Sequence, residues 1–127
     1  MILLNHPDRL FASGGVERDI ARELYGLVAA LPIVSPHGHT DPTWFADNAA
    51  FANATELLIQ PDHYLLRMLF SQGLTLDDLG IMRADGSHGG ADPAAVWQLF
   101  AANYHLFRGT PTRLWMDHVF GEVGVAG

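Results

Sequence analysis

The sequence predicts a mostly α-helical chain with a single short strand. Several segments carry apolar residues at three- and four-residue spacing, the pattern of amphipathic helices. Most of these segments begin near a proline or an aspartate and end at a glycine or a proline, as helices commonly do. The chain has 127 residues, of which 49% are hydrophobic, enough for a globular core. At roughly 150 residues per domain, it is one compact unit or part of something larger.

The first helix and the strand follow each other directly. Apolar residues recur at helical spacing from Val16 to Leu31, and a proline ends the pattern. Ile33 and Val34 are apolar and β-branched, and the prolines and glycine around them disfavour a helix. We therefore expect a helix up to residue 31 and a short buried strand over residues 32–39.

Four further helical segments are expected after residue 60: residues 61–73, 75–80, 92–109 and from 110 onward. Proline and aspartate favour a helix start, because proline needs no amide partner there and an acid complements the helix dipole. Glycine ends the first three segments. Thr75 and Asp78 form the pattern of a capping box.

A lone strand is physically unusual, because its backbone donors and acceptors must pair with other strands. The sequence offers no clear second strand. Either the strand prediction is wrong, or the chain is a fragment and its sheet is supplied from elsewhere.

Composition excludes several classes of partner and site. Seven basic residues stand against 14 acidic ones, so a general binder of nucleic acid is not expected. The sequence has no cysteine, so any metal must be held by histidine and carboxylate. No secretory signal and no apolar run of the ~20 residues that span a membrane is present, so we expect a cytoplasmic protein without membrane contact.

His37 and His39 are candidate metal ligands. In a strand, positions two apart project to the same face, so both imidazoles can meet one cation. The pair follows an apolar strand, where open α/β folds and barrels place their reactive groups. The alternative is a loop whose histidines only cap backbone groups, and the spacing alone leaves both interpretations open.

A second candidate site lies in the segment 61–73. His63 and Arg67 are four residues apart and share one helix face, where Arg67 offers a bidentate fork to a carboxylate and Tyr64 adds a hydroxyl. The alternative is a solvated face on which Asp62 or another acid pairs with Arg67. The pattern alone favours this alternative.

Five motifs together resemble the N-terminal part of the uronate isomerases, which belong to the amidohydrolase superfamily. They are HPDRLF at 6–11, RDIARELY at 18–25, LPIVSPHGHTDPTWFADN at 31–48, DHYLLRMLFSQG at 62–73 and TPTRLW at 110–115. The resemblance implies a metal-dependent-hydrolase-like (β/α)8 barrel in which strand 1 is followed by a helical insertion. Residues 1–44 would start the barrel with strand 1 and the His-x-His motif, and residues 45–127 would form the helical insertion subdomain. The rest of the barrel would be absent, because a complete one needs about 250 residues.

The resemblance also implies the chemistry. The family isomerises D-glucuronate to D-fructuronate and D-galacturonate to D-tagaturonate. By resemblance, His37 and His39 match its metal ligands for a divalent ion, zinc, and His63, Tyr64 and Arg67 match the segment that positions the hexuronate substrate. This chain shows no strong candidate for the catalytic base, so the fragment alone is expected to be inactive.

Two alternatives remain open at this stage. One is a metal-dependent hydrolase of the same superfamily, and the other is a non-enzymatic helical module whose histidines are structural. Apolar surface exposed by truncation would favour a homo-oligomer under either interpretation.

Overall fold

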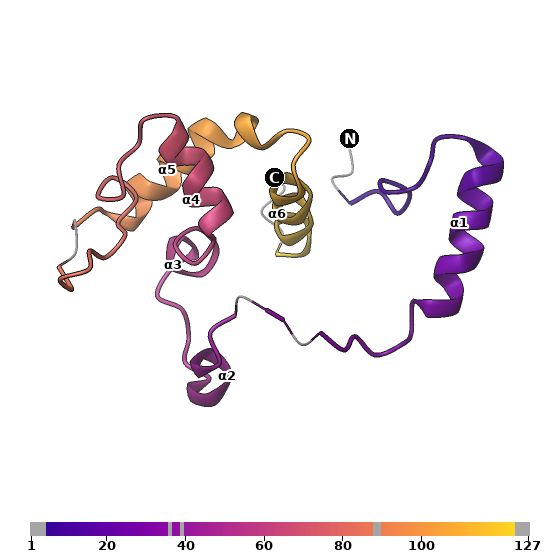
Figure 1. Ribbon diagram of the computed structural model, residues 1–127, viewed down its shortest axis with the longest axis horizontal. Helices are drawn as coiled ribbons and strands as arrows, with labels where there is room; N and C mark the ends of the chain where they lie inside the picture. Colours follow the sequence, from indigo (N-terminus) through magenta and orange to yellow (C-terminus); the bar gives the residue numbers. More distant parts are fainter. Residues whose placement is uncertain (1–4, 36, 39, 88–89, 124–127) are drawn as a thin grey trace. The chain divides into compact units, whose positions relative to one another are not determined.

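A computed structural model describes residues 5–35, 37–38, 40–87 and 90–123 (Figure 1). The described residues form helices and turns and contain no strand. The elements are α1 (Gly15–Val28), α2 (Thr43–Asp47), α3 (Ala54–Leu58), α4 (His63–Ser71), α5 (Pro93–Asn103), the 3-10 helix η1 (Tyr104–Phe107) and α6 (Pro111–Glu122). The chain divides into two compact units, Met1–Asn48 with Phe120–Gly127, and Ala49–Val119. Among the described residues, no helix is long and apolar enough to cross a membrane.

The expected strand over residues 32–39 is not formed in the part of it that the structure describes. Residues 33–35 form neither helix nor strand, and Figure 1 shows the chain between α1 and α2 as a trace. Ile33 and Val34 are 94% and 89% exposed, so the expectation of a buried segment is also wrong. The physical reason is backbone hydrogen bonding. The described residues offer no second strand whose amides and carbonyls could pair with those of this segment.

Helix boundaries in the second unit agree with the capping signals in the sequence. The Asp62 carboxylate accepts hydrogen bonds from the amides of Tyr64 and Leu65, at 2.9 and 3.1 Å, and starts α4. Asp92 caps α5 in the same way, with a proline in the first turn. The predicted capping box between Thr75 and Asp78 is present, although the residues after it form turns rather than a helix.

The second unit has its own hydrophobic core. Its buried apolar side chains come from α3 through α6 and the turns between them: Ile59, Leu65, Leu69, Leu79, Val96, Phe100, Phe107 and Met116. The ring of Phe100 packs against those of Trp97, Tyr104 and Phe107, with centroids 5.3 to 6.1 Å apart. Aromatic pairs at such distances add to the stability gained from burial.

Two side chains hydrogen-bond to distant backbone within this unit. The buried Thr55 hydroxyl donates to the carbonyl of Pro93 at 2.7 Å and so joins α3 to the start of α5. The Gln60 amide donates to the carbonyl of Gly80 at 3.1 Å. Gly80 has a φ of +68°, and a Cβ there would lie 3.0 Å from the Gln60 nitrogen, so both conformation and space favour glycine.

A polar cluster joins η1 to α6. The Tyr104 hydroxyl donates to Asp117 at 2.7 Å, and the Nε of Arg113 donates to both oxygens of the same carboxylate at 2.9 Å. The Arg113 guanidinium also lies over the Tyr104 ring, 4.1 Å from its centroid. Burial, followed by the hydrogen bond to Asp117, raises the pKa of the Tyr104 phenol well above its ordinary value.

The first unit is organised differently, because none of its described residues is buried. Asp8 accepts a hydrogen bond from the Nε of Arg22 at 2.9 Å, and Phe11 meets Tyr25 edge to face, so the N-terminal segment is held to α1. The apolar face of α1 and its continuation is not covered by the other described residues of this unit. Its members are 53% to 73% exposed: Val16, Ile20, Leu24, Leu27 and Leu31.

Replacing Thr55 by valine tests the link between α3 and α5. The change keeps a β-branched side chain but leaves the Pro93 carbonyl without its donor, so the free energy of unfolding should fall by about 1–2 kcal/mol. Urea unfolding followed by circular dichroism measures the loss. Thr55→Ser retains the hydroxyl and should lose less. A Thr55→Val chain as stable as the unsubstituted one would contradict this role for the hydroxyl.

Alkaline unfolding tests the Tyr104 cluster. Because the pKa of Tyr104 is higher in the folded than in the unfolded chain, its contribution to stability is complete below about pH 10 and falls as the pH rises through the folded pKa. Tyr104→Phe should lower stability at pH 7 and flatten the loss above pH ~10. Urea unfolding across this range measures both effects. Tyr64→Phe, at an exposed position, is the control; equal slopes for the two variants would refute the assignment.

Candidate functional site

His37 lies between α1 and α2, outside any helix, and is exposed to solvent. The hydroxyl of Ser35 donates to the His37 carbonyl at 2.7 Å. On the other side, Asp41 accepts hydrogen bonds from the amide and the hydroxyl of Thr43 at the start of α2, and these bonds hold the pKa of its carboxyl below the usual range. The predicted partner His39 lies outside the described residues, so the shared orientation of the two imidazoles stays a prediction.

Among the residues that the structure describes, no group of three or more histidine and acidic side chains is placed to hold a metal ion. Zinc sites use three or four protein ligands. The predicted pair of His37 and His39 therefore accounts for at most part of a complete coordination shell, and further ligands would have to come from outside the described residues.

The α4 candidates lie within the first five residues of the helix, with Arg67 about one turn beyond His63. His63, Tyr64 and Arg67 are all exposed, and the rings of His63 and Tyr64 lie 4.1 Å apart between centroids. Leu65 and Leu69 are fully buried and hold the helix in the core of the unit. The structure thus presents an imidazole, a phenol and a guanidinium on a helix whose position is fixed by packing.

The solvated-face interpretation of α4 required an acid to pair with Arg67. The carboxylate of Asp62 instead binds the amides at the start of α4. No described residue forms an ion pair with Arg67. The guanidinium is therefore available for an anion from outside the described residues, while the binding roles of His63, Tyr64 and Arg67 stay predictions.

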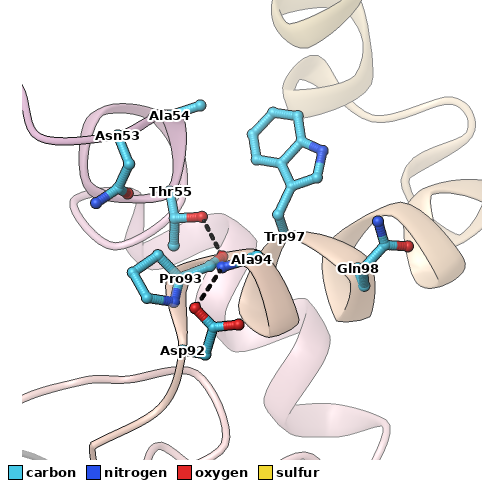
Figure 2. A pocket seen from close by; sticks show the side chains of 8 residues that line it. All are labelled: Asn53, Ala54, Thr55, Asp92, Pro93, Ala94, Trp97 and Gln98. Carbon is cyan, nitrogen blue, oxygen red and sulfur yellow. Dashed lines mark hydrogen bonds between the residues drawn. The ribbon is translucent and has the colours of Figure 1, made fainter.

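A separate hollow of about 470 Å³ lies between the starts of α3 and α5. Figure 2 shows the indole of Trp97 on one side and Thr55 and Pro93 at the base. Three of its polar side chains already have roles within the unit, since Thr55 donates to the Pro93 carbonyl, Asn53 caps α3 and Asp92 caps α5. None of the predicted site residues lines this hollow. Sequence reasoning missed it because it forms between two helices separated by more than 30 residues.

Comparisons with known proteins identify close relatives of this chain. The uronate isomerase of Xanthomonas euvesicatoria pv. vesicatoria (strain 85-10) is 62% identical over 122 residues, which is 96% of this chain and 26% of the relative. The uronate isomerase of Sphingopyxis alaskensis is 66% identical over 117 residues, 92% of this chain and 24% of the relative. The crystal structure of glucuronate isomerase from Caulobacter crescentus superposes with a TM-score of 0.86 at 55% identity, covering 93% of this chain and 24% of that one.

The chain spans about a quarter of the length of these relatives. The family model for glucuronate isomerase matches residues 13–120, a range that includes His37 and the exposed surface of α4. A match over most of the chain, together with relatives at this level of identity, is far more specific than any single motif. The chain belongs to the glucuronate isomerase family.

Proposed function

We propose that this chain is the N-terminal part of a cytoplasmic uronate isomerase. The full-length protein would isomerise D-glucuronate to D-fructuronate and D-galacturonate to D-tagaturonate. The observation that carries the proposal is the family match over residues 13–120. The exposed cationic surface of α4 adds chemical support, because a uronate is distinguished from a neutral sugar by its carboxylate.

We assign recognition of this carboxylate to Arg67. A guanidinium binds a carboxylate through two parallel hydrogen bonds, which fix orientation as well as position. His63 and Tyr64, on the same exposed part of α4, would hydrogen-bond to sugar hydroxyls. The buried Leu65 and Leu69 hold the helix that carries these groups in place before the substrate binds.

The histidine donors are of the kind that binds a divalent metal ion, but the described residues supply too few of them to complete its coordination shell. Imidazole nitrogen is a preferred ligand of zinc, and His37 is accessible to solvent. His37 and His39 would hold the ion, with the remaining ligands supplied by the rest of the full-length protein. When bound, a zinc ion supplies Lewis acidity that polarises the carbonyl and hydroxyl oxygens of the sugar.

The proton that moves between C2 and C1 needs a base, and we assign none in this chain. The role of His63, Tyr64 and Arg67 is to bind and orient the sugar acid beside the metal ion. Residues 1–127 alone are therefore expected to give no turnover.

Kinetics of the full-length enzyme test the role of Arg67. Arg67→Met keeps the aliphatic stem but removes the charged fork, so kcat/KM for D-glucuronate should fall about 10- to 100-fold, mainly through a higher KM. Arg67→Lys should restore part of this loss. Arg108→Met, at another exposed arginine of the same unit, is the matched control and should behave like the unsubstituted enzyme.

Two outcomes would contradict the proposal. An unchanged KM in Arg67→Met would remove the carboxylate-binding role. A full-length enzyme that hydrolyses amides or lactones and leaves D-glucuronate unchanged would assign a hydrolase of the same superfamily instead. The 127-residue chain alone is the negative control, and measurable turnover by it would place the catalytic base within these residues.

A further inference from the structure

We propose that the hollow between the starts of α3 and α5 binds a neutral pyranose sugar, a hexose or its glycoside, against the indole of Trp97. The site is separate from the α4 surface assigned above to the uronate carboxylate, because no residue of that surface lines the hollow. All of the lining residues belong to the second unit, so the proposal does not depend on the reaction of the full-length protein.

The walls of the hollow combine an aromatic ring with small apolar side chains. Trp97 forms one wall, and Ala54, Pro93 and Ala94 complete the apolar lining. Figure 2 shows the indole standing above Pro93 and Ala94, from the next turn of α5. The face of an aromatic ring carries partial negative charge. The C–H bonds on one face of a pyranose point partially positive hydrogens at such a ring, so the sugar can stack on the indole.

Polar side chains of the hollow retain unused hydrogen-bonding groups of both kinds. The Gln98 amide forms no hydrogen bond to a described residue. Asn53 and Asp92 each use one side-chain oxygen as a helix cap, so the Asn53 Nδ2 and the Asp92 Oδ2 bond to no described residue. Amides donate and accept, carboxylates accept, and hydroxyls do both. The lining therefore offers partners for several sugar hydroxyls.

Charge makes an anionic ligand unsuitable. Among the described residues that line the hollow there is no arginine, lysine or histidine, whereas Asp92 is present. The carboxylate of a uronate would meet that of Asp92 without a cation between them, and like charges repel. The ligand of the hollow is therefore neutral, in contrast to the ligand assigned to Arg67.

A quaternary ammonium ion would suit a carboxylate and an indole but fits the lining less well. Such cations are held by cages of several aromatic rings, and Trp97 is the one aromatic residue among the described residues of the lining. The ion has no hydrogen-bonding group, so it would leave the amides of Asn53 and Gln98 without partners. A sugar uses both amides.

The hollow also has the size and rigidity of a small-molecule site. Its volume of about 470 Å³ lies within the range of about 300–1,000 Å³ typical of ligand pockets. The hydrogen bond from Thr55 to the Pro93 carbonyl fixes its base, and the Trp97 ring packs edge to face with Phe100, with centroids 5.6 Å apart. Walls formed before binding lower the entropic cost of association.

Titration of the isotope-labelled 127-residue chain with methyl β-D-glucopyranoside, followed by NMR, tests the proposal. The indole N–H of Trp97 and the side-chain amide of Gln98 should shift with one dissociation constant of about 1–10 mM, because a hollow lined by exposed residues binds weakly. D-glucuronate offers a similar ring with an added carboxylate. At low ionic strength it should bind the hollow about 3- to 10-fold more weakly than the glycoside.

Two substitutions probe the lining. Trp97→Leu removes the aromatic face and should weaken glycoside binding about 10-fold. Gln98→Leu removes an amide at an exposed position and should weaken it about 3- to 10-fold. Trp115→Leu is the matched control, because this exposed indole lies in the same unit and does not line the hollow. Circular dichroism checks the fold of each variant, and Gln98→Leu keeps the test decisive if Trp97→Leu unfolds the chain.

Each outcome decides the proposal. Glycoside shifts at Trp97 and Gln98 that weaken in their variants and persist in Trp115→Leu support it. Absence of a saturable shift overturns it, as does an unchanged affinity in the folded variants. D-glucuronate that binds the hollow as tightly as the glycoside contradicts the neutral ligand class. Tetramethylammonium that shifts the same signals at lower concentration than the glycoside assigns the hollow to a cation instead.

Discussion

Backbone pairing is the constraint on which the rest of this structure depends. An extended segment buries its side chains stably only when neighbouring strands accept and donate its hydrogen bonds, and the described residues contain no such neighbour for Ile33 and Val34. The apolar stripe of α1 is likewise exposed to solvent. Residues 49–119 meet their hydrogen-bonding needs within helices and turns, and these are the residues that form a core.

The candidate substrate surface depends on that core. Asp62 caps α4, Leu65 and Leu69 anchor it, and the remaining positions of the same short helix carry His63 and Arg67 to the solvent. The Asp62 carboxylate binds the helix amides, and no described residue forms an ion pair with Arg67. The proposed metal ligands lie instead in the unit that has no core.

Local signals predicted the helices well because caps act over three or four residues. Asp62 and Asp92 start α4 and α5 as expected. The strand could not be predicted correctly in the same way, because strand formation depends on pairing with residues far away in sequence. The residues alone favoured an acid beside Arg67, whereas no described acid pairs with it in the structure. Pairing of His37 with His39 concerns a residue outside the described part and stays a prediction.

Amide hydrogen exchange of the free 127-residue chain tests the central claim, that residues 49–119 form a core while no residue of α1 is buried. A helix of this length without tertiary packing is marginal in water, so the amides of Ile20 and Leu24 should exchange at close to unfolded-chain rates. Those of Leu69 and Phe100 should exchange far more slowly, in line with their burial. Protection of α1 equal to that of α5 in the monomeric chain would contradict the account.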